Sequence, residues 1–450
     1  MTQRLRVATH DTFRSFDNRN FRLFFGGQIV SQAGTWMQSV AIVWVVLDLT
    51  GSGIALGLVT AAEFLPILLL GAWAGVIADR VDHHRMMLAT QTAFLALAAT
   101  LSVLVLTGNA GVPALFALSL VFGTINAFDN PVRRALVTEL VPPTDVSNAV
   151  GLNSALMTGS RVIGPALAGI LIAGPGAGAA FALNAVTYLA VLSALLRMDR
   201  SRFRPAPRVA KAKGQLREGF RYVRRTPELR MPLVMMAVIG TFAFNYQVTL
   251  PLLAERTFGG DATTFTLLFA TLSLGSVVGA LVVAHRREFG LGFLVRMGAG
   301  LAASTVALTV APTLPLALLA ALAVGFTNVG IISGANAVVQ LRAAPEMRGR
   351  VLALLSVVFL GSTPIGSPIV GWVAETVGPR AALAVGAVAT AAIVVWTAHA
   401  LRRDATAGRA TEDVVAPAIA TVATADAGAP EGGPGAPSRE HAPALQHAAA

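Results

Sequence analysis

The stretch GVIADRVDHHRMML, residues 75–88, places six titratable side chains within seven positions, between two runs of almost purely apolar sequence. Each of these runs is long enough to cross a membrane as a helix, because about 20 residues at roughly 1.5 Å rise span a hydrocarbon core about 30 Å thick. Residues 75–88 therefore predict the surface turn of a pair of membrane-spanning helices.

The rest of the chain repeats this pattern. Hydrophobic residues make up 55% of the 450 positions and charged residues only 13%, which is too apolar for a soluble protein. The sequence predicts an all-α membrane protein with about twelve transmembrane helices in two six-helix bundles. The expected spans are Phe21–Leu47, Gly53–Ala78, Met86–Leu106, Pro113–Val137, Ser147–Ala173, Ala179–Leu196, Met231–Ala254, Thr263–Ala284, Phe289–Val310, Leu314–Val339, Val351–Val373 and Ala381–Ala400.

Positive charge gathers in alternate loops. The segment 197–230 holds twelve Lys and Arg residues, whereas loops 107–113, 174–178 and 311–315 hold no charge. Since Lys and Arg mark cytoplasmic loops, we expect both termini in the cytoplasm. Topology accounts for the net charge of +11 better than nucleic-acid binding does, because no aromatic platform accompanies the basic residues.

Two halves of the chain resemble each other. A shift of 202 residues places Gly123 on Gly325 and Asn126 on Asn328, which indicates a parallel duplication. The expected domains are a cytoplasmic N-terminus (1–20), a first bundle (21–196), a basic cytoplasmic linker (197–230), a second bundle (231–403) and a disordered tail (404–450). Within the linker, residues 215–225 predict an amphipathic helix on an anionic membrane surface.

Five motifs in order carry a family resemblance. They are LTGSGIALGL (49–58), GVIADRVDHHR (75–85), NAFDNPVRRALVTELV (126–141), GSRVIGPALAGIL (159–171) and LREGFRYVRRTPELR (216–230). Over residues 21–401 the chain resembles the major facilitator superfamily of transporters, and within it a bacterial branch that includes the enterobactin exporter and drug-efflux proteins. The resemblance implies a transporter of the bacterial cytoplasmic (inner) membrane.

In the superfamily, the loop after the second helix forms a conformational latch. The matching residues are Gly75, Asp79, Arg80 and Arg85. The resemblance implies that Asp79 lies at the N-terminus of the eleventh helix in one conformation only, where the helix dipole stabilises its charge. Asp82 and His83 depart from the family pattern, and the alternative is a solvated basic loop that sets orientation.

A glycine- and proline-containing segment of the fifth helix resembles the antiporter motif of proton-coupled exporters. Its residues are Gly159, Gly164, Pro165 and Gly169. The resemblance implies a hinge surface between the halves, and ordinary close packing of small residues is the alternative.

Three ionisable residues fall within predicted helices: Glu63, Asp129 and Arg161. Because such residues are costly in hydrocarbon, they tend to face a cavity or a partner. All three are candidates for proton coupling. A structural ion pair of Asp129 with Arg133 or Arg134 is the alternative, and Glu63 and Arg161 are otherwise paired structural charges.

Polar side chains on the first, fourth, seventh and tenth helices predict a substrate cavity. The candidates are Gln32, Trp36, Asn126, Asn245, Gln247, Asn328 and Asn336. Amides among apolar residues suit an amphipathic or lipophilic organic molecule. Hydrogen bonding between helices is the alternative for each of them.

The sequence also narrows the energy source. It contains no phosphate-binding loop and no cysteine, so we expect no nucleotide, no cofactor, no metal site and no enzymatic activity. The remaining source is an ion gradient. We expect a monomeric secondary transporter that exports small molecules such as drugs or siderophores in exchange for protons. An importer or uniporter, a lipid flippase and a non-transporting sensor are the alternatives.

Overall fold

The computed structural model describes residues 13–204, 215–286 and 289–425, and helices are the regular secondary structure throughout these ranges. The chain divides into two compact units, with the boundary between Ala398 and His399. The helices are α2 (Arg19–Thr50), α3 (Gly53–Ala78), α4 (His83–Leu106), α5 (Val112–Glu139), α6 (Val146–Ala173), α7 (Ala177–Leu196), α8 (Gln215–Arg225), α9 (Pro227–Phe242), α10 (Tyr246–Phe258), α11 (Ala262–Ala284), α12 (Leu291–Val310), α13 (Leu314–Arg342), α14 (Pro345–Thr376) and α15 (Pro379–Ala425), with short 3-10 turns at Arg14–Asp17, Pro143–Asp145 and Arg200–Arg202.

Twelve spans within the described residues are long and apolar enough to cross a membrane, which confirms the predicted fold. Helices satisfy their own backbone hydrogen bonds, which is the condition for crossing hydrocarbon. The seventh span is interrupted. It consists of α9 and α10, which are separated at residues 243–245, and this break includes Phe244 and Asn245 of the segment FNYQ (244–247).

Glycines allow the closest helix contacts in each half. A Cβ added at Gly123 of α5 would lie 2.1 Å from the Glu63 carbonyl oxygen of α3. A Cβ added at Gly325 of α13 would lie 1.8 Å from the Leu272 carbonyl oxygen of α11. These two glycines are the ones that the internal duplication aligns, so the halves repeat the same backbone-to-backbone crossing.

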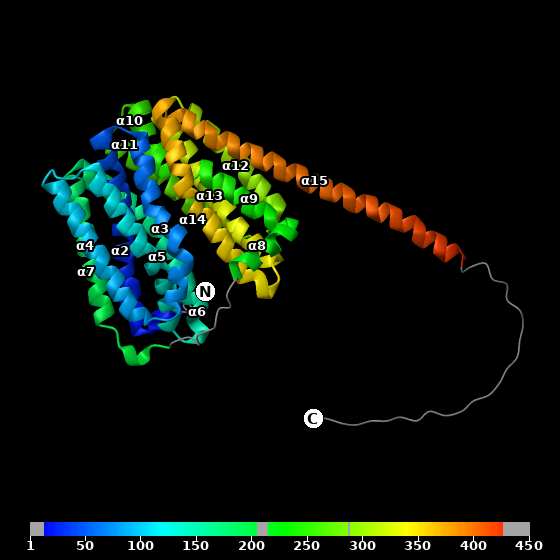
Figure 1. Cartoon of the computed structure of the whole chain (residues 1–450), viewed down its shortest axis with the longest axis horizontal. Helices are drawn as coiled ribbons and strands as arrows, with labels where there is room; N and C mark the ends of the chain where they lie inside the picture. The colour runs from blue at the N-terminus through cyan, green and yellow to red at the C-terminus, as the bar shows by residue number, and fades with distance from the viewer. Residues whose placement is uncertain (1–12, 205–214, 287–288, 426–450) are drawn as a thin grey trace, which may run out of the picture. The chain divides into compact units, whose positions relative to one another are not determined.

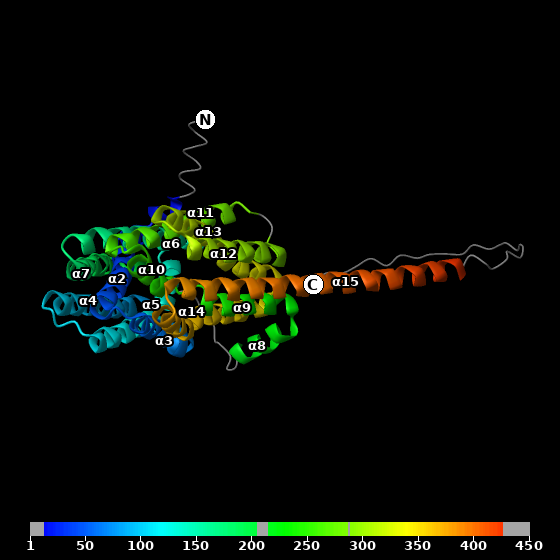
Figure 2. The same ribbon diagram turned by 90° about the horizontal axis from the view of Figure 1, so that it is seen from above.

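The loops lie at two ends of this bundle unit. We call the end with the loops after α3, α5, α7, α11 and α13 the basic end, and the end with the loops after α2, α4, α6, α10, α12 and α14 the opposite end. Helices α3 and α14 run antiparallel between the two ends and contact each other, as do α6 and α11 (Figures 1 and 2). These two helix pairs form the interface between the halves.

At the opposite end, the halves touch closely. An added Cβ at Gly57 would lie 2.4 Å from the Ser367 carbonyl oxygen, and one at Gly371 would lie 2.3 Å from the Gly53 carbonyl oxygen. On the other helix pair, an added Cβ at Gly169 would lie 2.4 Å from the Thr266 hydroxyl oxygen.

Toward the basic end, the same helix faces lose these contacts. At 100° per residue, Gly75 lies on the face of α3 that carries Gly57, and Gly151 lies on the face of α6 that carries Gly169. An added Cβ at Gly75 or Gly151 would meet nothing within 4 Å. Gly75, one of the predicted latch residues, therefore makes no close contact with a neighbouring helix in this conformation. The halves are in contact at the opposite end and separated at the basic end.

Helix α8 covers the predicted amphipathic segment of the linker. Val223 is buried, while Phe220 is exposed. Gly219 faces Arg350 and Leu354 of α14, and Glu218 pairs with Arg350 at 2.7 Å. Part of the apolar face that we expected on the membrane surface therefore packs against the second half.

The tail differs from the expected disorder over part of its length. Helix α15 continues to Ala425 and so includes residues 404–425 of this segment. Residues 426–450, like residues 1–12, 205–214 and 287–288, lie outside the described residues.

The repeated glycine crossing gives a prediction. Gly123→Val and Gly325→Val should each destabilise the fold, by about 1–3 kcal/mol or more, because the new side chain meets a backbone carbonyl. The measurement is the monodisperse yield of detergent-purified protein after a heating series.

The matched control is Gly71→Val on α3, where an added Cβ meets nothing within 4 Å. Equal thermal stability of the Gly123 and Gly71 variants would contradict this account of the crossing.

Candidate functional site

Arg161 lies at mid-depth on α6 and faces the space between the halves. At roughly 1.5 Å per residue it is about 22 Å from the start of the helix and about 18 Å from its end. Ile170, an exposed apolar residue, lies on the opposite face of α6. The Arg161 side chain is exposed, and its guanidinium carbon lies 5.1 Å from the ring centre of Trp36 on α2. The structure thus brings together two residues that the sequence nominated separately.

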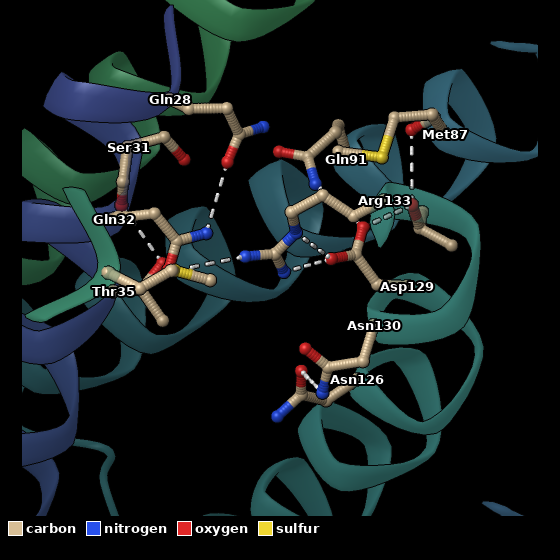
Figure 3. A network of polar contacts seen from close by, with 12 residues as sticks. Gln28, Ser31, Gln32, Thr35, Met87, Gln91, Asn126, Asp129, Asn130 and Arg133 are labelled. Atoms are coloured by element: carbon tan, nitrogen blue, oxygen red, sulfur yellow. Dashed lines mark hydrogen bonds and ion pairs between the residues drawn. The ribbon is translucent and has the colours of Figure 1, made fainter. Parts of the chain in front are cut away.

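Asp129 and Arg133 form a buried ion pair on α5 (Figure 3). Asp129 has no exposed surface and Arg133 has 6%. Arg133 Nε donates to Asp129 Oδ2 at 3.0 Å, and its Nη2 donates to the same oxygen. Of the alternatives for Asp129, the structure contains the ion pair with Arg133.

Helix α4 completes this network. The Thr90 hydroxyl donates to Asp129 Oδ1 at 2.7 Å, and Gln91 Nε2 donates to the same oxygen at 2.8 Å. Arg133 Nη1 also points to the Met157 sulfur of α6 at 3.8 Å. Thr90 and Gln91 were not predicted, although two adjacent polar residues inside an apolar span were a usable signal.

Glu63 occupies a different environment, inside the first half. It lines a small cavity with room for about one water molecule. The other lining residues are Gln38, Ser39, Ile42, Leu97, Leu101, Leu118, Ser119 and Phe122. The Glu63 carboxyl interacts with the Ser39 side chain, and none of the ion pairs among the described residues includes Glu63.

The predicted cavity amides in the first half are bonded within their own helices. Gln32 Nε2 donates to Gln28 Oε1 at 3.1 Å, and Asn130 Nδ2 donates to Asn126 Oδ1 at 2.9 Å. Gln28 and Asn130 were not predicted. These contacts match the alternative of structural hydrogen bonding for Gln32 and Asn126.

The amides of the second half include two with an unsatisfied oxygen. Asn245 lies in the break between α9 and α10, where its Nδ2 donates to the Thr241 carbonyl at 2.7 Å. The Oδ1 atoms of Asn245 and Asn328 are buried without a hydrogen-bond partner. Asn336 Nδ2 donates to its own helix at Ile332, and Gln247 is half-buried. No described contact joins these amides to Trp36 or Arg161.

The expected hinge segment of α6 divides into two contacts. An added Cβ at Gly164 would lie 2.4 Å from the Trp36 Cβ, so this glycine packs α6 on α2. Gly169 packs α6 on α11, whereas a Cβ added at Gly159 would meet nothing within 4 Å. Pro165 lies inside a helix that continues past it. Close packing within and between halves accounts for Gly164 and Gly169.

A contact that the sequence did not predict joins the halves at the opposite end. Glu375, near the end of α14, accepts hydrogen bonds from the backbone N–H groups of Gly53 at 2.5 Å and Ile54 at 3.4 Å. Arg256 of α10 donates to the backbone carbonyls of Gly51 and, at 3.2 Å, Ala374. Charged side chains of the second half therefore satisfy helix ends of the first.

The comparisons with known proteins agree with this architecture. A family model described as "Transmembrane secretion effector" matches residues 10–429. The chain belongs to the major facilitator superfamily. It is therefore a membrane transporter and not an enzyme.

Relatives within this superfamily include transporters linked to efflux. The chain is 27% identical to the staphyloferrin A transporter of Staphylococcus aureus over 272 residues, which cover 58% of this chain and 66% of that protein. It is 26% identical to the multidrug efflux pump Tap of Mycolicibacterium fortuitum over 377 residues, which cover 78% of this chain and 88% of that protein. It is 22% identical to macrolide efflux protein A of Streptococcus pyogenes, over 80% of this chain and 90% of that protein.

Solved structures of major facilitator transporters share the fold. The nucleoside transporter NupG superposes with a TM-score of 0.68 at 10% identity, covering 85% of this chain and 99% of that one. The chain also superposes on a bacterial homologue of the human lysosomal transporter Spinster in an inward-facing and unoccupied conformation. The TM-score is 0.64 at 16% identity, and the match covers 85% of this chain and 95% of that one.

The residues of the expected superfamily latch lie at the basic end, where the halves are apart. Arg80 is exposed, and Arg85 lies 3.8 Å from Asp82. Partial burial opposes ionisation of Asp82, but the Arg85 N–H bond and the charges of Arg200 and Arg85 hold the pKa of Asp82 below its ordinary value. Asp82, which departs from the family pattern, is the N-cap of α4 and accepts a hydrogen bond from the Arg85 backbone N–H.

The register of α3 on α14 bears on the latch. Gly53 contacts Gly371 and Gly57 contacts Ser367. Because the helices are antiparallel, each step of four residues forward along α3 corresponds to four residues back along α14, and the two residue numbers of each contact add up to 424. Extended along both helices, the same register would place Asp79 opposite Pro345, the first residue of α14. The latch of Asp79 on the N-terminus of α14 stays a prediction for a conformation that is closed at the basic end.

The buried pair on α5 gives a second prediction. Arg133→Met should destabilise the transporter by about 3–5 kcal/mol, because it leaves Asp129 buried without its counter-charge. The double variant Asp129→Asn/Arg133→Met should recover most of the loss, since no buried charge remains. Thermal unfolding of the purified proteins measures both, and an Arg133→Met variant as stable as the parent protein would refute the prediction.

The contact of Glu375 with the N-terminus of α3 gives a third prediction. Glu375→Gln should shift the population toward separation of the halves at that end, since the carboxylate at the N-terminus of α3 contributes about 0.3–1 kcal/mol and up to about 2 kcal/mol. Because the chain has no cysteine, Asn109→Cys and Thr313→Cys can carry spin labels on exposed loops of the two halves.

The expected result is a longer component in the measured distance distribution. The control is Glu255→Gln, which removes an exposed charge on α10 at the same end. If Glu375→Gln and Glu255→Gln give the same distribution as the parent protein, Glu375 does not hold the halves together.

Proposed function

We propose that this transporter exports small amphipathic organic molecules in exchange for protons, by alternating access of a central site to the two sides of the membrane. The observation that carries the proposal is the difference between the two ends of the interface. The halves pack backbone to backbone at the opposite end and are separated at the basic end, with Arg161 and Trp36 between them at mid-depth.

The charge distribution supports an orientation. Lys and Arg concentrate at the basic end, which the positive-inside rule assigns to the cytoplasm. With that orientation, the described conformation is open to the cytoplasm of a bacterial inner membrane, and both termini are cytoplasmic. An exporter in this state is ready to take up its substrate. We also propose that a single chain is sufficient for transport, since both halves of the interface come from it.

The two membrane-embedded carboxyl groups differ in their fitness for proton coupling. Asp129 has four hydrogen bonds, two of them from Arg133, that stabilise its charged form. Glu63 interacts with the Ser39 hydroxyl, is in no ion pair among the described residues, and lines a cavity with room for about one water molecule. Since burial of an unpaired charge is costly, gain and loss of a proton at Glu63 would change the energy of this region most. We assign the coupling proton to Glu63.

The names of the relatives support export. One is an efflux pump for several drugs, one is an efflux protein for macrolides, and one is a staphyloferrin A transporter. Trp36 beside Arg161, and the amides that the sequence nominated for a cavity, suit amphipathic molecules. One proton moving down 100 mV supplies about 2.3 kcal/mol, which is enough for roughly fifty-fold accumulation of a neutral substrate.

The test is accumulation of a panel of fluorescent dyes, macrolides and siderophores in a host that lacks its own efflux pumps. We expect the transporter to lower accumulation of at least one compound. A protonophore and Glu63→Gln should each abolish this effect, and Asp129→Asn should reduce it through lower protein stability.

The control is Asp261→Asn, which keeps the cap of α11 in an exposed loop. All variants are compared at equal amounts of membrane protein. Export that persists in the protonophore, or in Glu63→Gln, would overturn the proposed coupling, and the absence of any exported compound would overturn the proposed direction.

A further inference from the structure

The Arg161 guanidinium is a charge without a counter-charge. No carboxylate and no hydrogen-bond acceptor among the described residues contacts it, and its one described interaction is with the Trp36 ring. Arg133, the other arginine deep within the first half, is neutralised by Asp129. Arginine at mid-depth in a membrane costs at least about 2.5–3.5 kcal/mol, so a function must compensate for its placement.

The site is reachable from the basic end. On α6, Val150 and Ser154 lie within about 20° of Arg161 around the helix axis, and both are exposed. Gly164 and Gly169, which are nearer the opposite end, are buried against α2 and α11. The face that carries Arg161 is therefore open toward the basic end and covered beyond the arginine. A molecule entering between the halves would meet the guanidinium near the closed end of its path.

The contact with Trp36 leaves the hydrogen-bonding groups of the guanidinium free. The Arg161 guanidinium carbon lies over the Trp36 ring, 5.1 Å from its centre, and a cation–π contact of this kind attracts the charge without using the N–H groups. A guanidinium carries five N–H donors and can bind a carboxylate through two parallel hydrogen bonds. Gly164 is necessary for this arrangement, because any side chain there would collide with the Trp36 Cβ.

We propose that Arg161, held by Trp36, binds the carboxylate of an amphipathic organic acid, which is the substrate class of this transporter. The inference rests on the proposed function only in taking the bound acid to be a transported substrate. The binding of a carboxylate follows from the geometry of Arg161 and Trp36 alone. One unpaired guanidinium matches one negative charge. A doubly charged phosphate monoester would need a second cation, which the described contacts of this site do not include.

The experiment measures binding to the purified full chain in detergent, without a membrane potential. Three acids serve as probes: decanoate, 4-phenylbutyrate and naphthalene-2-carboxylate, each paired with its own neutral amide. The readout is the temperature at which half the protein is lost from the monodisperse peak of a size-exclusion column. A ligand that binds the folded state raises this temperature as its concentration rises.

We expect at least one acid to raise the midpoint by several degrees more than its amide. Arg161→Gln should abolish the difference between acid and amide, and Arg161→Lys should retain part of it. Arg296→Gln, which removes an exposed arginine from α12, should leave the difference unchanged. Since Arg161 has no hydrogen bond or ion pair within the described residues, its variants should fold.

Three outcomes would overturn the inference: no acid exceeds its amide, the difference survives in Arg161→Gln, or a short-chain phosphatidylglycerol stabilises the protein more than any acid does. The last outcome would indicate a lipid headgroup site. Failure here and failure of the proposed function are separable, because acid binding requires neither export nor a proton gradient, and export of neutral compounds would persist without an acid site.

Discussion

The contact between α3 and α14 is the interaction on which the rest of the structure depends. Glycines at positions 53, 57 and 371 let the two backbones approach until carbonyl oxygens and Cα atoms touch. In a membrane, helix association relies on such close packing, since burial of apolar side chains gains little over contact with lipid. The contact joins the two halves at one end only. The separation at the other end follows from the same two helices, which diverge along their length.

Much of the fold could be predicted from the sequence, because the bilayer imposes a length and a composition on each helix. The twelve spans and the helix in the linker both follow from local patterns. The duplication aligned Gly123 with Gly325, and both glycines make the same crossing. The partner of α8 could not be predicted, since the same apolar face can be covered by lipid or by another helix.

The site was predicted less completely, and the reason is again physical. Arg161 and Trp36 were both nominated, but nothing in their spacing of 125 residues indicated that they contact each other. Asp129 and Arg133 share a helix face, so their pairing was one of the predicted alternatives. Thr90 and Gln91 were missed because hydroxyl and amide groups inside apolar spans are common, and only the approach of α4 to α5 shows what they bind. Charges are easier to notice in such a sequence than the neutral groups that stabilise them.

Glu375 and Arg256 bind groups at the ends of α2 and α3, where a helix has backbone N–H and C=O groups without partners. Since α2 and α3 are long and apolar enough to span a membrane, their ends are expected at its surface, where bulk water is present. When the halves separate there, water molecules can replace each lost hydrogen bond, so the net change in free energy per bond is small. The same bonds placed at mid-depth would have no such replacement. Hydration therefore keeps low the free energy that breaking these bonds would cost if the halves separated at this end.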